Sequence, residues 1–332
     1  MTLSDATLDH LRAVAGEPDA DGRYEILDEI ARGGMGTIYR ALDRELGREV
    51  ALKVSSRPGA GADAQERLVR EARVLARLEH PGLVPVHDVG TLPDGRLFYA
   101  MKRVRGHRLD EHFAAEPSIP ARLRTFERIC ETVAFAHAHG VIHRDLKPEN
   151  VMVGPFGEVL VLDWGVARLR EDVPPASVPS DAPSPPVPGR TAHGTVLGTP
   201  GYMAPEQARG EVERTDERAD VYALGAILYF LVTDVAPPPS GPAGAPRRRN
   251  PSVPRPLDSI CSKALAADPL ARYPSVQALS ADVSAFLSGR PVAAHREGPL
   301  EWAGRQAARY RTPLLLIAAY LAMRVALILW PR

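Results

Sequence analysis

The hydrophobic pattern of this 332-residue chain changes near residues 102–106. Before that point the apolar residues form short runs rich in β-branched and aromatic side chains, such as YEILDEIA, GTIYRALD and REVALKVS, with turns between them. One helical pattern, DAQERLVREARVLARLEH, interrupts these predicted strands. After Gly106 helical patterns dominate, among them LRTFERICETVAFAHAHG and ERADVYALGAILYFLVTD. The sequence therefore predicts an α+β chain with a small β-rich lobe followed by a larger helical lobe.

Composition narrows the class of protein. Lys plus Arg equals Asp plus Glu at 41 each, which gives no support for a nucleic-acid partner. Cys130 and Cys261 lie far apart without metal-type spacing, so we interpret them as reduced core residues in a cytosolic setting. Residues 1–22 predict a polar arm without a signal-peptide core. The Pro-rich stretches 173–189 and 236–256 predict exposed loops.

A highly charged stretch, HRDLKPEN at residues 143–150, lies between two apolar runs. This arrangement predicts a polar loop held between two buried elements. A solvated turn would account for the loop, and so would a set of catalytic groups held on a rigid scaffold. The stretch ARGGMG at residues 31–36 also has two interpretations. Its glycines would let the backbone approach a phosphate, but a hairpin turn explains them equally well.

Two charged residues in apolar runs require partners or ligands. Lys53 lies in the strand pattern VALKV, where an unpaired charge would be costly, and either Glu71 or Glu66 on the following helix could pair with it. Asp163 ends the apolar run in VLVLDWG, and together with Asn150 it offers the hard oxygen ligands that Mg²⁺ prefers.

These motifs, in this order, resemble those of a bacterial eukaryotic-like (Hanks-type) serine/threonine protein kinase. The resemblance covers roughly Tyr24 to Gly289 and implies a bilobal protein-kinase fold. The expected divisions are an N-lobe over 24–104, a C-lobe over 105–290 and a juxtamembrane segment over 291–313.

The resemblance implies transfer of the γ-phosphate of ATP to Ser or Thr of protein substrates, with Mg²⁺ or alternatively Mn²⁺ as the metal. Asp145 is then the group that accepts the hydroxyl proton, and Lys147 reaches toward the γ-phosphate. Asn150, also counted among the catalytic residues, and Asp163 hold the metal. A catalytic loop, rather than a solvated turn, then explains the charges at 143–150.

The resemblance also implies an ATP site. Lys53 binds the α- and β-phosphates and Glu71 is its helix partner. The other expected ATP contacts are Ala31, Gly33, Gly34, Gly36, Ile38, Ala51, Met101, Val104 and Met152. The family usually has glycine in place of Ala31 and phenylalanine in place of Trp164, so the loop turn and the packing of the regulatory switch are expected to differ.

The stretch GTPGYMAPE at residues 198–206 resembles the end of the activation segment of this family. Thr199, together with Lys147, resembles the Ser/Thr-specific subclass. Thr195 matches the usual activating phosphosite, and Thr191 is the alternative. A phosphate on either could pair with Arg144 and order the loop.

Further matches support the same family. Asp220 and Gly225 match the acidic residue and the glycine of the large helix that follows the activation segment in this family. Arg272 is expected to pair with Glu206. Intact Lys53, Asp145, Asn150 and Asp163 favour an active enzyme over a pseudokinase-type nucleotide-binding scaffold. The alternative of a small-molecule phosphotransferase would lack the sequence Ala204-Pro205-Glu206. His143 is expected to be structural, and His137 and His139 are expected on a helix surface rather than in a zinc site.

The segment 314–330 is apolar except for Arg324. As a helix it would span about 25 Å, close to the roughly 30 Å of a bilayer core. The basic residues that precede it predict a single-pass membrane protein whose kinase region faces the cytoplasm. A helix packed on the kinase or lying in the membrane interface, and hence a cytoplasmic protein, is the alternative. Whether the chain forms a homodimer for trans-autophosphorylation stays open.

Overall fold

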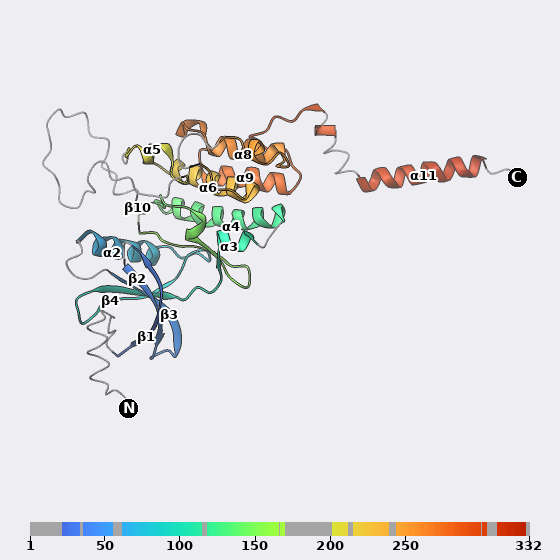
Figure 1. The fold of residues 1–332 in the computed structure, drawn as a ribbon. Coiled ribbons are helices and arrows are strands. Elements are labelled where there is room, and N and C mark those ends of the chain that lie inside the picture. Colours follow the sequence, from blue (N-terminus) through green and yellow to red (C-terminus); the bar gives the residue numbers. More distant parts are fainter. Residues whose placement is uncertain are drawn as a thin grey trace, which may run out of the picture.

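In the computed structural model the described residues are 22–33, 36–55, 62–114, 118–165, 167–169, 201–211, 215–238, 244–299, 301–303 and 311–329. Figure 1 shows a sheet-rich lobe, a helical lobe and a C-terminal helix that stands clear of both. The predicted sites Gly34, Thr191, Thr195 and Thr199 lie outside the described residues, as does the Pro-rich stretch 173–189.

The N-lobe is an antiparallel sheet of five strands in the order β1-β2-β3-β5-β4. The strands are β1 (Tyr24–Gly33), β2 (Gly36–Asp43), β3 (Arg48–Ser55), β4 (Val86–Thr91) and β5 (Leu97–Lys102), and the helix α2 (Ala62–Arg77) packs against them. A tight turn precedes β5, where Gly95 has a φ of +83° and its N–H donates to the carbonyl of Leu92. The predicted β-rich lobe with one helix is therefore confirmed.

The C-lobe is helical, as predicted. Its helices are α3 (Leu109–Ala114), α4 (Ile119–Ala138), α5 (Pro205–Ala208), α6 (Arg218–Thr233), α7 (Pro246–Arg249), α8 (Arg255–Ala264) and α9 (Val276–Leu287). Short strands accompany them: β6 (His107–Arg108), β7 (Val141–Ile142), β8 (Val151–Val153), β9 (Val159–Val161) and β10 (Arg168–Leu169). The 3-10 turns are Pro148–Asn150 and Pro269–Ala271.

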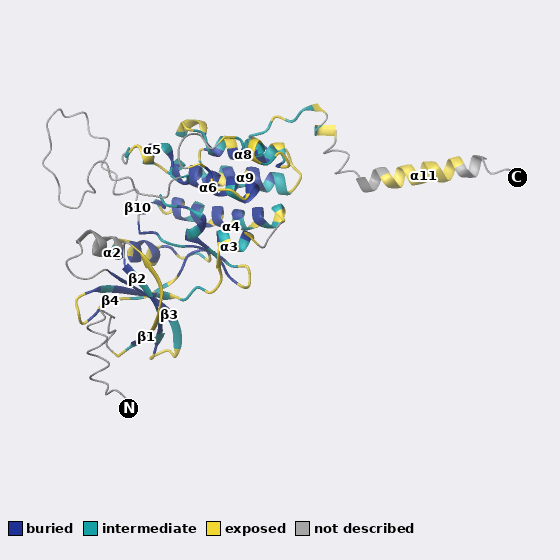
Figure 2. Ribbon diagram, viewed as in Figure 1, coloured by how far each residue is buried: buried dark blue, intermediate teal, exposed yellow. Residues whose placement is uncertain are grey.

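Helix α6 forms the centre of the C-lobe. It is apolar almost all round, which is the pattern of a helix buried on every side, and Figure 2 shows it as mostly buried. Gly225 lets α8 approach closely, since an added Cβ would lie 2.6 Å from the Cβ of Ala264. Cys130 and Cys261 are free and buried as predicted, and burial raises the pKa of both thiols.

The prediction of a plain exposed loop over 236–256 was wrong in part. The helix α7 lies inside this stretch and α8 begins at its end. Pro246 suits the first turn of α7 because a proline lacks only an N–H that has no intrahelical partner there. The N–H of Arg247 donates to Asp258 of α8, which attaches the short helix to the lobe.

Helix α11 (Arg311–Leu329) covers most of the predicted membrane segment. Residues 315–325 are exposed on all sides of the helix, as Figure 2 shows. Among the residues that the structure describes, no helix is both long and apolar enough to cross a membrane. The predicted transmembrane segment is therefore not confirmed.

The predicted ion pair between Arg272 and Glu206 is present and buried. Both terminal nitrogens of Arg272 lie 2.7 Å from the two carboxylate oxygens of Glu206, and the side chains are 0% and 4% exposed. The guanidinium also donates to the carbonyls of Arg218, Ala266 and Ala267. Such a pair fixes two segments in one geometry, because each group needs the other to stay buried.

Replacing Arg272 by leucine should lower the free energy of unfolding by about 3–5 kcal/mol, because Glu206 would be left as a buried carboxylate without a cation. Chemical denaturation of the full chain would measure this loss. The control is Arg209→Leu, which removes an exposed pair with Glu211 and should change stability little. Equal effects of the two substitutions would contradict the argument.

Candidate active site

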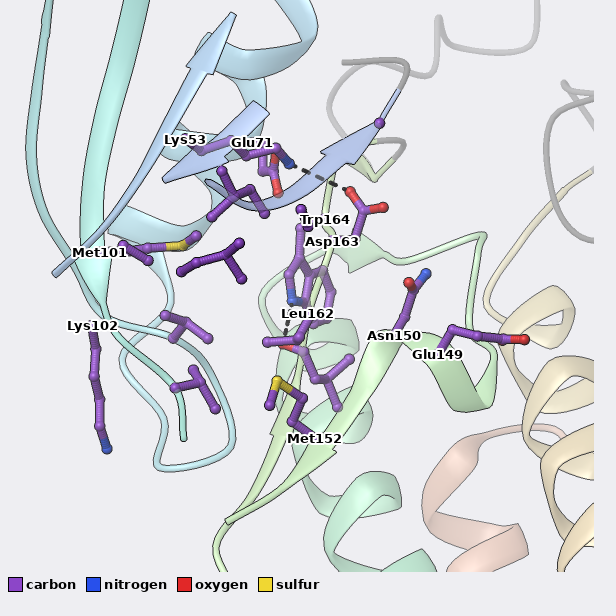
Figure 3. Close-up of a pocket in the computed structure, with 18 of the residues that line it drawn as sticks. Lys53, Glu71, Met101, Lys102, Glu149, Asn150, Met152, Leu162, Asp163 and Trp164 are labelled. Atoms are coloured by element: carbon purple, nitrogen blue, oxygen red, sulfur yellow. Dashed lines mark hydrogen bonds and ion pairs between the residues drawn. The ribbon is translucent and has the colours of Figure 1, made fainter. Parts of the chain in front are cut away.

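A cavity lies between the two lobes and is lined by residues from both (Figure 3). The N-lobe contributes β1, β2, β3, α2 and β5, and the C-lobe contributes the segments around β8 and β9. Every described residue predicted to contact ATP lines this one cavity: Ala31, Gly33, Gly36, Ile38, Ala51, Lys53, Glu71, Met101, Val104 and Met152. The predicted metal ligands Asn150 and Asp163 line it as well.

Lys53 and Glu71 form a buried ion pair at the polar end of the cavity. The Nζ of Lys53 donates to Glu71 Oε2 over 2.6 Å and lies 3.7 Å from Asp163 Oδ1. Burial alone would lower the pKa of Lys53, but the two carboxylates outweigh it and the pKa is raised. Lys53 therefore stays charged, and Glu71 rather than Glu66 is the partner observed.

The glycine-rich turn between β1 and β2 forms one wall of the cavity. Gly36 has a φ of +147°, and a Cβ there would lie 2.0 Å from the carbonyl oxygen of Val54, so only glycine fits without a shift. Ala31 pairs with Ile38 directly after a register irregularity between Glu29 and Ala31, and it does not have a positive φ. The backbone conformation at Ala31 therefore does not require glycine, and the expected effect of its methyl group on the turn stays a prediction.

Two polar side chains of the charged loop, those of Lys147 and Asn150, converge on the carboxylate of Asp145. Lys147 Nζ lies 3.0 Å from Asp145 Oδ2, and Asn150 Nδ2 lies 3.2 Å from the same oxygen. Asn150 also donates to the backbone carbonyl of Asp145 over 2.7 Å. The loop therefore presents a carboxylate with a neighbouring cation beside the cavity.

A buried carboxylate holds this loop from beneath. Asp220, at the start of α6, accepts the backbone N–H groups of His143 and Arg144, each over 2.8 Å. Arg144 has a φ of +71°, a conformation that costs a non-glycine residue roughly 1–3 kcal/mol and persists only where its surroundings impose it. The contacts from Asp220 supply that constraint.

His137 was placed wrongly by the sequence reasoning. It is buried, and its Nε2 lies 2.7 Å from Asp220 Oδ2. His143 is buried as predicted, with its ring 4.5 Å from that of Trp164 and its Nε2 hydrogen-bonded to the carbonyl of Leu162. Among the described residues no group of three or more His, Cys, Asp or Glu side chains is arranged to hold a metal ion.

Asn150 and Asp163 fit a divalent metal bound together with phosphate oxygens. Figure 3 shows the amide of Asn150 directed toward the side on which Asp163 lies, while the carboxyl of Asp163 faces Lys53. Asp163 Oδ1 is buried and accepts no hydrogen bond, although the Lys53 ammonium lies 3.7 Å away, so this oxygen can still accept a ligand. Mg²⁺ is usually held by one or two protein oxygens plus phosphates, which matches this sparse set.

Residues 24–282 match the protein kinase domain family. The chain belongs to this family. Among curated proteins the chain is 34% identical to the serine/threonine-protein kinase PknD of Chlamydia abortus, over 92% of this chain and 35% of that protein. It is 36% identical to PknD of Chlamydia felis, over 81% of this chain and 31% of that protein. The chain thus spans about a third of the length of the curated relatives it matches.

Solved structures give the same result. The chain is similar to a variant of the PknI kinase domain of Mycobacterium tuberculosis, with a TM-score of 0.61, 25% identity, and coverage of 87% of this chain and 100% of that one. A second PknI kinase domain matches at 28% identity with a TM-score of 0.59 over 79% of this chain and 96% of that one. The bilobal fold and the place among bacterial Hanks-type serine/threonine kinases are therefore confirmed.

The kinase domain contains a further contact that sequence reasoning missed. Gln207, next to Glu206, donates from Nε2 to the backbone carbonyl of Arg144 over 3.0 Å. The end of the activation segment therefore touches the loop that carries Asp145. Nothing in the local pattern of residues 204–208 distinguishes this glutamine from a surface side chain.

Gly36→Ala should lower the free energy of unfolding by about 1–3 kcal/mol, because the new Cβ meets a backbone carbonyl and the φ is unfavourable. Hydrogen exchange of β2 and β3 amides would locate the loss in the N-lobe sheet. Gly33→Ala is the matched control, since a Cβ there meets nothing within 4 Å. A loss for Gly33→Ala as large as for Gly36→Ala would contradict the steric explanation.

Proposed function

We propose that this protein is an active ATP-dependent serine/threonine kinase that phosphorylates protein substrates in signal transduction. The observation that carries the proposal is the convergence of Lys147 and Asn150 on Asp145, within 3.2 Å, beside the cavity that contains Lys53 and Asp163. A pseudokinase scaffold would not need a free carboxylate and a cation held together at this position.

In the proposed mechanism the adenine of ATP lies between Ile38 and Ala51 on one side and Met152 on the other, with its edge at the backbone of residues 102–104. Met101 closes the back of the pocket. The phosphates then extend toward Lys53, whose charge neutralises part of theirs. Mg²⁺, or Mn²⁺ in its place, would be held by Asn150 and Asp163 and would offset the remaining phosphate charge.

The substrate hydroxyl would approach Asp145, which accepts its proton as the oxygen attacks the γ-phosphorus; the bond from that phosphorus to the β,γ-bridging oxygen breaks and ADP leaves. Lys147 lies beside Asp145 and faces the charge that develops on the transferred group. Phosphoryl transfer needs mainly alignment and charge neutralisation, which positioned side chains on a rigid loop supply. Thr199 would contribute to the choice of Ser or Thr over Tyr.

Control by the activation segment is the second part of the proposal. A phosphate on Thr195, or alternatively on Thr191, would add a charge of about −1.5 to −2 and pair with the guanidinium of Arg144. Arg144 precedes Asp145 directly, so such a pair would act on the catalytic loop itself. Autophosphorylation between two copies, in a transient homodimer, is the expected route.

The third part of the proposal is attachment to the cell membrane through residues 314–330, with the kinase domain on the cytoplasmic side. Apolar side chains of α11 are exposed to an unusual degree, between 53% and 67% for Leu315, Leu316, Ile317, Tyr320, Leu321, Met323 and Val325. A continuous apolar surface of this kind favours a non-aqueous environment. Arg305, Arg309 and Arg311 precede the segment and favour a cytoplasmic location for that end.

Asp145→Asn should lower the single-turnover rate of phosphoryl transfer by about 10²–10⁴-fold, because the proton acceptor is lost, while ATP affinity stays unchanged. Lys53→Met should also abolish transfer, through misplaced phosphates. Rapid-quench kinetics and an ATP-binding titration would separate the two steps. Asp216→Asn, an exposed substitution in the same lobe, is the control. Wild-type rates for Asp145→Asn would rule out the assignment.

The double variant Thr191→Ala/Thr195→Ala should lose most of its kinase activity, because no phosphate can pair with Arg144. Mass spectrometry of the wild-type chain after incubation with Mg-ATP should find phosphate on one of these threonines. Ser177, Ser180 and Ser184 provide the control, since alanine at all three should leave activity unchanged. Full activity of the threonine variant would show that activation follows another route.

The full chain should sediment with membranes and resist carbonate extraction, and truncation after Arg311 should make it soluble. A chain that sediments but is released by carbonate would indicate a helix in the membrane interface. Full-length protein that stays soluble without detergent would contradict membrane attachment.

A further inference from the structure

Part of the predicted juxtamembrane segment folds back onto the C-lobe. Residues 291–303 follow α9 and are termed here the C-terminal strap; residue 300 lies outside its described part. Val292 is buried in the main hydrophobic cluster. The backbone N–H groups of Ala293 and Ala294 donate to the two carboxylate oxygens of Asp282 on α9, over 2.7 and 3.0 Å. The strap is therefore docked at a defined position.

A second anchor involves His295, whose ring lies between two polar groups. Its Nδ1 is 3.0 Å from Ser259 Oγ on α8, and its Nε2 is 3.0 Å from Glu301 Oε2. Ser259 also lies 3.1 Å from the carbonyl oxygen of Arg255 and has a single hydroxyl proton to donate. The His295 ring therefore bridges Ser259 of α8 and Glu301 of the strap.

Glu301 completes this anchor. Its other oxygen accepts from Arg255 over 3.2 Å, and its Oε2 also accepts the N–H of Gly298 over 3.2 Å. The hydrogen bond from His295, then that from Gly298, holds the pKa of Glu301 below its usual value. Loss of His295 would leave the exposed pair of Arg255 and Glu301 as the remaining side-chain link described between the strap and α8.

The first anchor connects to the activation segment through buried groups. Besides the strap, Asp282 accepts the hydroxyl of Tyr273 over 2.8 Å, and Tyr273 is adjacent to Arg272. Arg272 pairs with Glu206, and the neighbouring Gln207 bonds to the catalytic loop, as described above. Asp282 is buried, so an undocked strap would deprive its carboxylate of two of these three donors, which is costly. Asp282 and Tyr273 would then have to move.

We propose that docking of the C-terminal strap on Asp282 and Ser259 is a regulatory contact that supports the catalytic loop through Tyr273, Arg272 and Glu206. This inference rests on the kinase activity proposed above. Because the strap precedes α11 in the chain, a force or a binding event on α11 that undocks the strap would lower the rate of phosphoryl transfer. ATP binding would not change, because neither the strap nor Asp282 nor Tyr273 lines the cavity.

The test uses the full chain and the variants His295→Ala, Tyr273→Phe and their combination. His295→Ala should speed hydrogen exchange at the amides of Ala293 and Ala294. It should lower kcat by about three- to tenfold and leave the KM for ATP within about twofold of wild type. Tyr273→Phe should lower kcat similarly. Because both act along one path, the double variant should lose little more than the worse single variant.

The matched control is Arg296→Ala, an exposed strap residue next to His295, which should leave exchange and kcat unchanged. Glu301→Gln is a milder second variant if His295→Ala does not fold, and it should show the same pattern. An undocked strap with unchanged kcat, or single effects that multiply in the double variant, would overturn the inference alone. An inactive wild-type chain would overturn the proposed function as well.

Discussion

The geometry of the catalytic loop depends on one buried carboxylate, that of Asp220. Burial by itself favours the neutral acid, but hydrogen bonds from His137 and from the backbone outweigh it and lower the pKa of Asp220. The ionised group accepts the N–H groups of His143 and Arg144, and it thereby holds Arg144 at a φ of +71°. Because α6 is buried on nearly every side, the carboxylate of Asp220 is fixed in position. The catalytic loop that it binds is therefore attached to the core of the C-lobe.

The same loop is held from a second direction. Gln207 contacts the carbonyl of Arg144, and its neighbour Glu206 is fixed by Arg272. The loop therefore lies between α6 and the end of the activation segment, and a change in either would reach Asp145. A separate constraint joins the lobes: Lys53 of the N-lobe faces Glu71 beside it and Asp163 from the C-lobe. Charged side chains therefore fix the conformation of the catalytic loop, through Asp220, and join the two lobes, through Lys53 and Asp163.

The sequence allowed most of the fold and the composition of the site to be predicted, because periodicity identifies strands and helices, and charges in apolar runs require partners. The sequence could not decide whether Glu71 or Glu66 pairs with Lys53, since that choice depends on which face of α2 meets β3. It placed His137 on the surface because its partner Asp220 is 83 residues away in the chain. The helix α7 was missed because prolines usually indicate loops, whereas here one begins a helix. The contact of His295 with Ser259 likewise has no local signature.

The two parts of the C-terminal region interact in different ways. The strap is held by directional hydrogen bonds to Asp282, Ser259 and Glu301, so it has one orientation on the C-lobe. Apart from Arg324, helix α11 exposes apolar side chains on all its described sides, so apolar contact alone would leave it free to rotate about its axis. Within the described part of the C-terminal region, the strap is therefore the part whose position on the kinase domain is fixed by directional contacts. Because the strap shares Asp282 with Tyr273, the contact that fixes its position is also the one nearest to Arg272.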